Sequence, residues 1–114
     1  MQVHAHAEDR LLIARVEGRF DAHGIERFTS HVVERVNADT PNVTIDLSSV
    51  EFMDSSALAG LVKTLKRTME HAGSIVLIAP SDPARIILEL TRLDEVFPTA
   101  TSLVEARAQL LADA

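Results

Sequence analysis

Polar and apolar residues alternate in the middle of the chain and then change to a helical spacing within a few positions. Val43, Ile45 and Leu47 lie between polar neighbours, and this two-residue period predicts a strand over residues 44–47 with an apolar run continuing to Phe52. A helix is predicted from Ser55 to about residue 72, because apolar residues recur there three or four positions apart. Its stripe consists of Leu58, Leu61, Val62, Leu65 and Met69.

The first forty residues predict a hairpin and one helix. Two strand-like runs, residues 3–7 and 11–16, flank a polar turn, as in a pair of antiparallel strands. Apolar residues three and four positions apart then predict a first helix that ends before Pro41. This stripe consists of Ile25, Phe28, Val32 and Val36.

The residues after the central helix predict another strand and a third helix. Gly73 supplies the end of the central helix, and the continuous apolar run at 75–79 is typical of a strand covered on both faces. Asp82 as cap and Pro83 at the first helical position predict the start of a third helix. Its buried stripe is expected to be Ile86, Ile87, Leu90 and Leu93.

The end of the chain predicts a short strand and a last helix. Val96 and Phe97 form the expected strand, just before a proline. Ser102 and Glu105 fit a capping box that would start a C-terminal helix. Its expected inward residues are Leu103, Ala106 and Leu110.

Strands that alternate with helices after an opening hairpin predict an α/β sandwich, with helices packed on a mixed sheet. The chain has 114 residues, of which 46% are apolar, and this suits a single core. We therefore expect one domain over residues 1–114.

Charge and composition argue against several classes of function. Seventeen acidic residues against 11 basic ones give a net charge of −6. The sequence has no run of basic residues, and this argues against direct nucleic-acid binding. No apolar run is long enough to cross a bilayer, and the N-terminus does not resemble a signal peptide. The absence of cysteine excludes disulfides and thiolate metal sites. We expect a cytoplasmic protein without membrane insertion.

The polar turn Asp54-Ser55-Ser56 is the main candidate for function. Asp and Ser both cap helices by accepting hydrogen bonds from the first free N–H groups, and capping alone would explain these residues. A phosphate on Ser55 would also be well held, because free N–H groups and the positive end of the helix dipole converge there. The spacing leaves both interpretations open.

Patterns typical of catalysis or metal binding are missing from the sequence. There is no Gly-x-Ser-x-Gly motif, no histidine is placed by sequence as a base for Ser55, and single glycines are scattered rather than grouped in a phosphate-binding loop. His4 and His6 share one strand face without a third ligand at a recognisable spacing. We expect no enzyme activity, no metal and no cofactor.

The turn and its flanks resemble a known family. Residues 44–65 read TIDLSSVEFMDSSALAGLVKTL, similar to the signature of STAS domains and specifically of bacterial anti-sigma factor antagonists, which ends in Phe-Met-Asp-Ser-Ser-Gly-Leu. Gly18-Arg19-Phe20-Asp21 looks like the family's Gly-Glu-Leu-Asp turn, and Gly73 precedes a similar strand. The resemblance covers residues from about 11 to 110 and implies a STAS-type sandwich of about five strands and about four helices.

The resemblance also implies the site and its partners. Ser55 corresponds to the residue that the partner kinase phosphorylates, Ser56 to a secondary hydroxyl, and Asp54 to an acid that helps to position the hydroxyl. The implied partners are an anti-sigma factor that is a serine kinase of the histidine-kinase-like ATPase type, and a metal-dependent serine phosphatase. The expected partner-binding residues are Asp21, Met53, Asp54, Ser55, Ser56, Ala57 and Leu58.

The sequence departs from the family pattern at two positions. Ala57 replaces the usual glycine and is expected to add a methyl group where a kinase approaches, and Arg19 replaces the usual Glu. These changes keep an alternative function open, that of a constitutive STAS subunit docking on the ATPase of a lipid-transporting membrane complex. An enzyme with Ser55 as nucleophile is a third hypothesis, against which the missing base argues.

Overall fold

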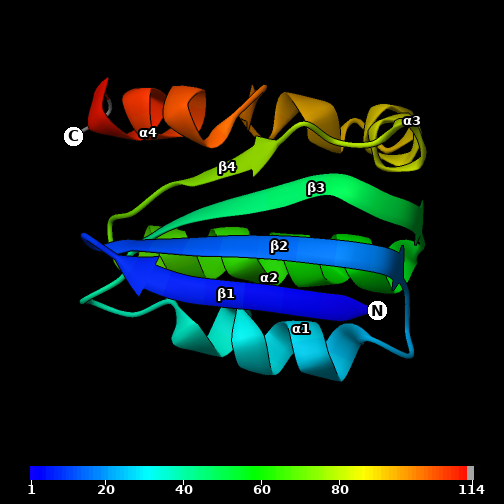
Figure 1. The fold of residues 1–114 in the computed structure, drawn as a ribbon, viewed down its shortest axis with the longest axis horizontal. Coiled ribbons are helices and arrows are strands. Elements are labelled where there is room, and N and C mark those ends of the chain that lie inside the picture. The colour runs from blue at the N-terminus through cyan, green and yellow to red at the C-terminus, as the bar shows by residue number, and fades with distance from the viewer. Residues whose placement is uncertain (113–114) are drawn as a thin grey trace.

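The computed structural model describes residues 1–112, with a five-stranded sheet of order β1-β2-β3-β4-β5 at its centre (Figure 1). β1 runs antiparallel to β2, and the remaining neighbours are parallel. This is the mixed sheet that the hairpin and the strand–helix alternation predicted. The strands are β1 (Gln2–Glu8), β2 (Leu11–Phe20), β3 (Asn42–Met53), β4 (Ile75–Ile78) and β5 (Thr99–Ala100).

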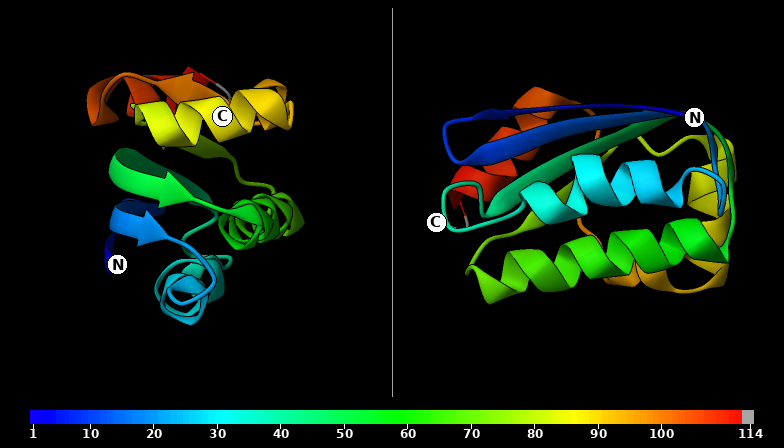
Figure 2. Two further views of the ribbon diagram at one scale, coloured as in Figure 1. Left: turned by 90° about the vertical axis from the view of Figure 1, so that its right-hand side faces the viewer. Right: turned by 90° about the horizontal axis from the view of Figure 1, so that it is seen from below.

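Helices cover both faces of the sheet, and α1 and α2 lie side by side on one of them (Figure 2). The side chains of β4 alternate between two hydrophobic clusters, one for each face of the sheet. Ile75 and Leu77 belong to the larger cluster with α1 and α2, whereas Val76 and Ile78 pack with α4. α3 adds Ala84 to the larger cluster. The helices are α1 (Ile25–His31), α2 (Ser55–Glu70), α3 (Asp82–Leu90) and α4 (Leu103–Ala112), with short 3-10 helices η1 (Val33–Arg35) and η2 (Leu93–Glu95).

β3 is the longest strand, with 12 residues, and it extends well past the four residues predicted for it. Its parallel pairing with β2 continues to the pair Phe20 and Met53, with irregular register near Gly18. Because the two strands are parallel, their carboxyl ends meet at one edge of the sheet. The loop after β2 and the start of α2 are thereby brought together.

Three predicted boundaries near the middle of the chain are corrected. α1 ends at His31 and continues only as η1, so the first helix is shorter than predicted. Met69 is 67% exposed, so the buried stripe of α2 ends before it. Ala72, rather than Gly73, adopts the left-handed conformation after α2, with φ of 57°. Gly73 is needed instead for close packing, since a Cβ there would collide with the carbonyl group of Pro41.

Corrections in the last third of the chain follow from capping and strand pairing. Ser81 caps α3, its Oγ accepting from Ala84 N at 3.4 Å, so Asp82 is already the first helical residue. The last strand is Thr99–Ala100 because these residues pair with β4, while Phe97 is buried just before it.

The exposure of the terminal helices also differs in part from the prediction. In α3, Ile86 and Leu90 are exposed instead of buried. In α4, Glu105 N donates to Ser102 Oγ at 3.2 Å, as expected of a capping box, but the Glu105 carboxylate accepts from Thr101 Oγ1. The expected inward residues of α4, Leu103, Ala106 and Leu110, do pack on the sheet.

Candidate functional site

Asp54 organises the turn between β3 and α2. Its Oδ1 accepts hydrogen bonds from Ser56 N at 2.9 Å and Ala57 N at 3.1 Å, which caps the helix. Its Oδ2 accepts from Ala22 N at 3.2 Å in the loop after β2, and its own N–H donates to Phe20 O at 3.4 Å. One carboxylate therefore holds both the helix start and the neighbouring loop.

Ser55 is the first residue of α2, and its side chain is exposed. Within residues 1–112 its hydroxyl takes part in no hydrogen bond, because the capping role belongs to Asp54. Ser56, the next residue, is half-buried. Of the two interpretations left open by spacing, capping therefore applies to Asp54, and the Ser55 hydroxyl is available for chemistry at the surface.

The structure divides the seven expected partner-binding residues into surface and core. Ser55 is exposed, and Asp21, Asp54 and Ser56 are half-buried at the same edge. The methyl group of Ala57, expected at the point of kinase approach, lies fully buried in the core instead. Buried with it are Met53 and Leu58.

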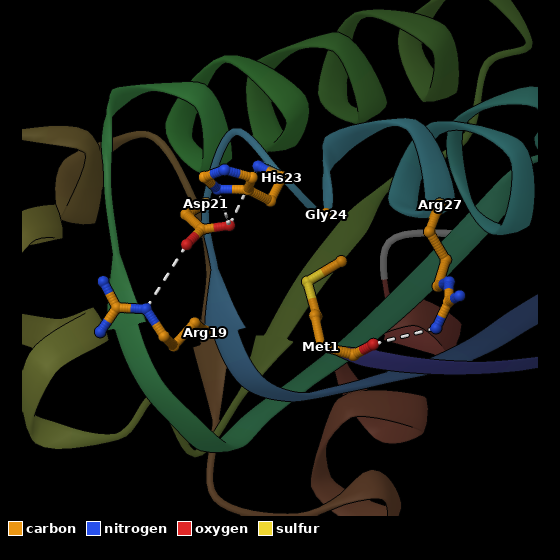
Figure 3. A pocket seen from close by; sticks show the side chains of 6 residues that line it. All are labelled: Met1, Arg19, Asp21, His23, Gly24 and Arg27. Carbon is orange, nitrogen blue, oxygen red and sulfur yellow. Dashed lines mark hydrogen bonds and ion pairs between the residues drawn. The ribbon is translucent and has the colours of Figure 1, made fainter.

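Asp21, the first residue after β2, lies among basic side chains from β2, the following loop and α1. Asp21 Oδ1 accepts from His23 N at 3.1 Å, and Asp21 Oδ2 lies 3.5 Å from Arg19 Nε. Arg27 Nη1 donates to Met1 O at 3.1 Å on the far side of an open pocket of about 540 Å³ (Figure 3). The pocket is lined by Met1, Arg19, Asp21, His23, Gly24 and Arg27.

Phe52 is a surface residue that the sequence did not single out. It continues the apolar run of β3, yet its side chain is 36% exposed and the guanidinium of Arg19 stacks over its ring at 4.1 Å. Its exposure could have been inferred from its position in the strand. Successive strand residues face opposite sides of the sheet, so the neighbour of the buried Met53 faces away from the core that contains Met53.

The described residues contain neither a cluster of potential metal ligands nor a helix suited to span a membrane. Across residues 1–112, no group of three or more His, Cys, Asp or Glu side chains is arranged to hold a metal ion. None of the helices in this range is both long and apolar enough to cross a membrane. The edge that carries Ser55 thus offers a free hydroxyl, two carboxylates and a stacked arginine.

A comparison with known sequence families supports the resemblance noted from the sequence. The family model described as the STAS domain matches residues 2–106. This chain belongs to the STAS domain family. The strand–turn–helix that presents Ser55 lies within the match, and the mixed sheet with four α-helices is the fold of solved STAS structures.

Named relatives of this STAS domain include anti-sigma factor antagonists. The anti-sigma F factor antagonist of Paenibacillus polymyxa is 22% identical over 111 residues, which cover 96% of this chain and 95% of that protein. An anti-sigma-factor antagonist (STAS) domain protein from Planctomyces limnophilus is 28% identical, with a TM-score of 0.82 and coverage of 97% of each chain.

The fold is also shared with SpoIIAA of Bacillus, whose structure is known in a phosphorylated form. That form has a TM-score of 0.75 and is 18% identical, with 95% of this chain and 98% of SpoIIAA covered. At this identity the likeness concerns the fold alone.

Proposed function

We propose that this STAS domain is an anti-sigma factor antagonist that is switched by phosphorylation at Ser55. In the unphosphorylated form it binds an anti-sigma factor and thereby releases a sigma factor. The observation that carries the proposal is the exposed Ser55 hydroxyl, which no hydrogen bond engages within residues 1–112. The names of the relatives support the class of function, since two of them are called anti-sigma factor antagonists.

The proposed chemistry is a phosphoryl transfer from ATP bound to the partner. The Ser55 oxygen attacks the γ-phosphorus, the bond to the β-phosphate oxygen breaks, ADP leaves, and the hydroxyl proton passes to a base of the kinase. The partner is an anti-sigma factor serine kinase of the histidine-kinase-like ATPase type. A metal-dependent serine phosphatase resets the switch in the cytoplasm.

Charge explains how the phosphate would weaken binding. A phosphoserine adds about −1.5 to −2 charges at neutral pH, at the rim of an interface where the partner is expected to place its own acidic surface or nucleotide phosphates. Placed in a desolvated interface next to like charge, it costs several kcal/mol, so affinity falls by about a hundredfold or more. No refolding is required, because the hydrogen bonds that Asp54 makes to the helix start do not involve the Ser55 hydroxyl.

The test is a calorimetric titration of the purified anti-sigma kinase with unphosphorylated and enzymatically phosphorylated protein. We expect the phosphorylated form to bind about a hundredfold more weakly, and phosphatase treatment to restore affinity. Ser55→Ala protein, passed through the same kinase reaction, is the control and should keep full affinity. Equal affinities of the two forms would contradict the switch and favour constitutive docking, the role expected of a transporter subunit.

A further inference from the structure

Arg19 and Phe52 form an exposed cation–π pair beside Ser55. The guanidinium carbon lies 4.1 Å from the ring centre, and the two residues are partners in the pairing of β2 with β3. Phe52 is 36% exposed. The three other phenylalanine side chains in the chain, in contrast, are buried: Phe20, Phe28 and Phe97.

The orientation of Arg19 leaves its outer nitrogens unused. Its Nε lies 3.5 Å from Asp21 Oδ2, and its Cζ lies over the Phe52 ring. Within residues 1–112 the two Nη atoms take part in no hydrogen bond or ion pair, and the side chain is 62% exposed. The guanidinium is therefore held through Nε by Asp21 (Figure 3), while its two Nη atoms remain available within residues 1–112.

This pair is continuous with the edge that carries Ser55. Phe52 lies near the end of β3, and Asp54, two residues later, is bonded to the loop after β2 through Ala22 N at 3.2 Å. The same loop contains Asp21, which holds Arg19. The Ser55 turn and the Arg19–Phe52 pair thus lie at the same edge of the sheet, where one partner surface can cover both.

We propose that Arg19, stacked on Phe52, binds a carboxylate of the anti-sigma partner and determines which partner is recognised. This inference rests on the proposed function. The planar fork of arginine matches a carboxylate with two parallel hydrogen bonds, and stacking on an aromatic ring orders the fork in advance. Such ordering lowers the entropy lost on binding. Arginine and aromatic residues are also enriched at protein interfaces.

The charge distribution of this chain favours an acidic contact of the partner at this point. The whole chain carries −6, so most of its surface repels an acidic partner, whereas Arg19 offers a local cation whose outer nitrogens are free within residues 1–112. An apolar side chain next to the partner's acid would cover the exposed part of Phe52. The expected partner surface is therefore an aspartate or glutamate flanked by an aliphatic residue.

The experiment compares variants in titrations with the same purified anti-sigma kinase. We expect Arg19→Gln to weaken binding about tenfold and Arg19→Glu to weaken it further, because the fork is lost and then replaced by a like charge. Arg19→Lys should recover only part of the affinity, since lysine keeps the charge without the planar fork. Lys66→Glu is the matched control, an exposed charge reversal further along α2, and should change affinity less than about twofold.

A reciprocal change identifies the contact. Acidic residues of the kinase are changed one at a time to lysine, and one of them should restore binding to Arg19→Glu while weakening binding to the unchanged protein. Melting curves of all variants establish that they fold.

The outcomes separate this inference from the proposed function. If Arg19→Gln binds like the unchanged protein while Ser55→Asp does not, the Arg19 contact is refuted and the switch stands. If Arg19→Gln weakens binding but phosphorylation has no effect, the switch is refuted and the contact stands. If Lys66→Glu lost as much affinity as Arg19→Glu, the effect at Arg19 would be explained by long-range charge repulsion, and the direct contact would be refuted. An effect of Arg19→Gln confined to the phosphorylated form would also refute it.

Discussion

The backbone N–H of Ala22 donates a hydrogen bond of 3.2 Å to Asp54 Oδ2, joining two segments that lie 32 positions apart in the sequence. The other oxygen of the same carboxylate caps α2. Asp54 is thus a structural residue as well as a neighbour of the phosphorylation site proposed above. Its loss should change the stability of the domain and the position of the loop that contains Asp21.

Replacing Asp54 by Ala should lower the free energy of unfolding by about 1–2 kcal/mol, because the capping bonds to two N–H groups are lost. Asp54→Asn keeps one acceptor oxygen, which can cap the helix or bind Ala22 N but cannot fully replace both carboxylate oxygens. It should therefore fall between Asp54→Ala and the unchanged protein. Urea denaturation measures the series, and an Asp54→Ala variant as stable as the unchanged protein would exclude the capping role.

Phosphorylation by the cognate kinase should add one phosphate, on Ser55. The neighbouring hydroxyl of Ser56 is half-buried, and Thr64 is fully buried with its hydroxyl bonded to Gly60 O at 2.8 Å. Peptide mapping by mass spectrometry locates the group, with Ser55→Ala as control. Modification of Ser56 with Ser55 untouched would show that the assignment is wrong.

Ser55→Ala should leave folding and partner binding intact, whereas Ser55→Asp should weaken binding. The Ser55 hydroxyl makes no hydrogen bond within residues 1–112, so the alanine variant should change the free energy of unfolding by less than about 0.5 kcal/mol. Aspartate introduces one negative charge, less than a phosphate, and we expect an intermediate loss of affinity. Calorimetry with the same kinase gives both values, and equal binding of the two variants would argue against charge repulsion.

Ala57→Gly should reduce stability without accelerating phosphorylation. The methyl group is buried, so its removal costs about 0.8 kcal/mol of burial in addition to about 0.5–1 kcal/mol for glycine in a helix. Ala59→Gly is the control, since Ala59 is exposed on α2 and loses only the helix contribution. Thermal melts measure the stability and steady-state kinetics the phosphorylation rate. A clear rise in the rate for Ala57→Gly alone would show that the Ala57 methyl group does hinder the approach of the kinase.

Two substitutions just after α2, Gly73→Ala and Ala72→Gly, should change the free energy of unfolding in opposite directions. Gly73→Ala places a methyl group against the carbonyl of Pro41, and such overpacking should cost about 1–3 kcal/mol. Ala72→Gly should raise stability by about 0.5–1 kcal/mol, because Ala72 has a φ of 57° that glycine adopts without strain. Both are read from chemical denaturation; a tolerated Gly73→Ala would show that the loop with Pro41 moves easily.

The sequence by itself determined the local parts of this protein. The change of period between Leu47 and Leu58 predicted the strand, the turn and the helix, because side-chain periodicity reflects backbone geometry within a few residues. Asp54 and Ser55 were identified as the turn for the same reason. The family signature lies in this continuous segment, so the STAS family was also readable from the sequence, and the family match confirms it.

Only the tertiary structure decided which of these residues face solvent and which distant groups meet. The last strand lies at Thr99–Ala100 because β4 pairs there, and Gly73 is required because Pro41 approaches it. Arg19 meets Phe52 only through the register of β2 with β3. Hydrogen bonds and stacking of this kind join residues 30 or so positions apart, whereas side-chain periodicity reflects only the geometry of neighbouring residues and does not specify which distant groups meet.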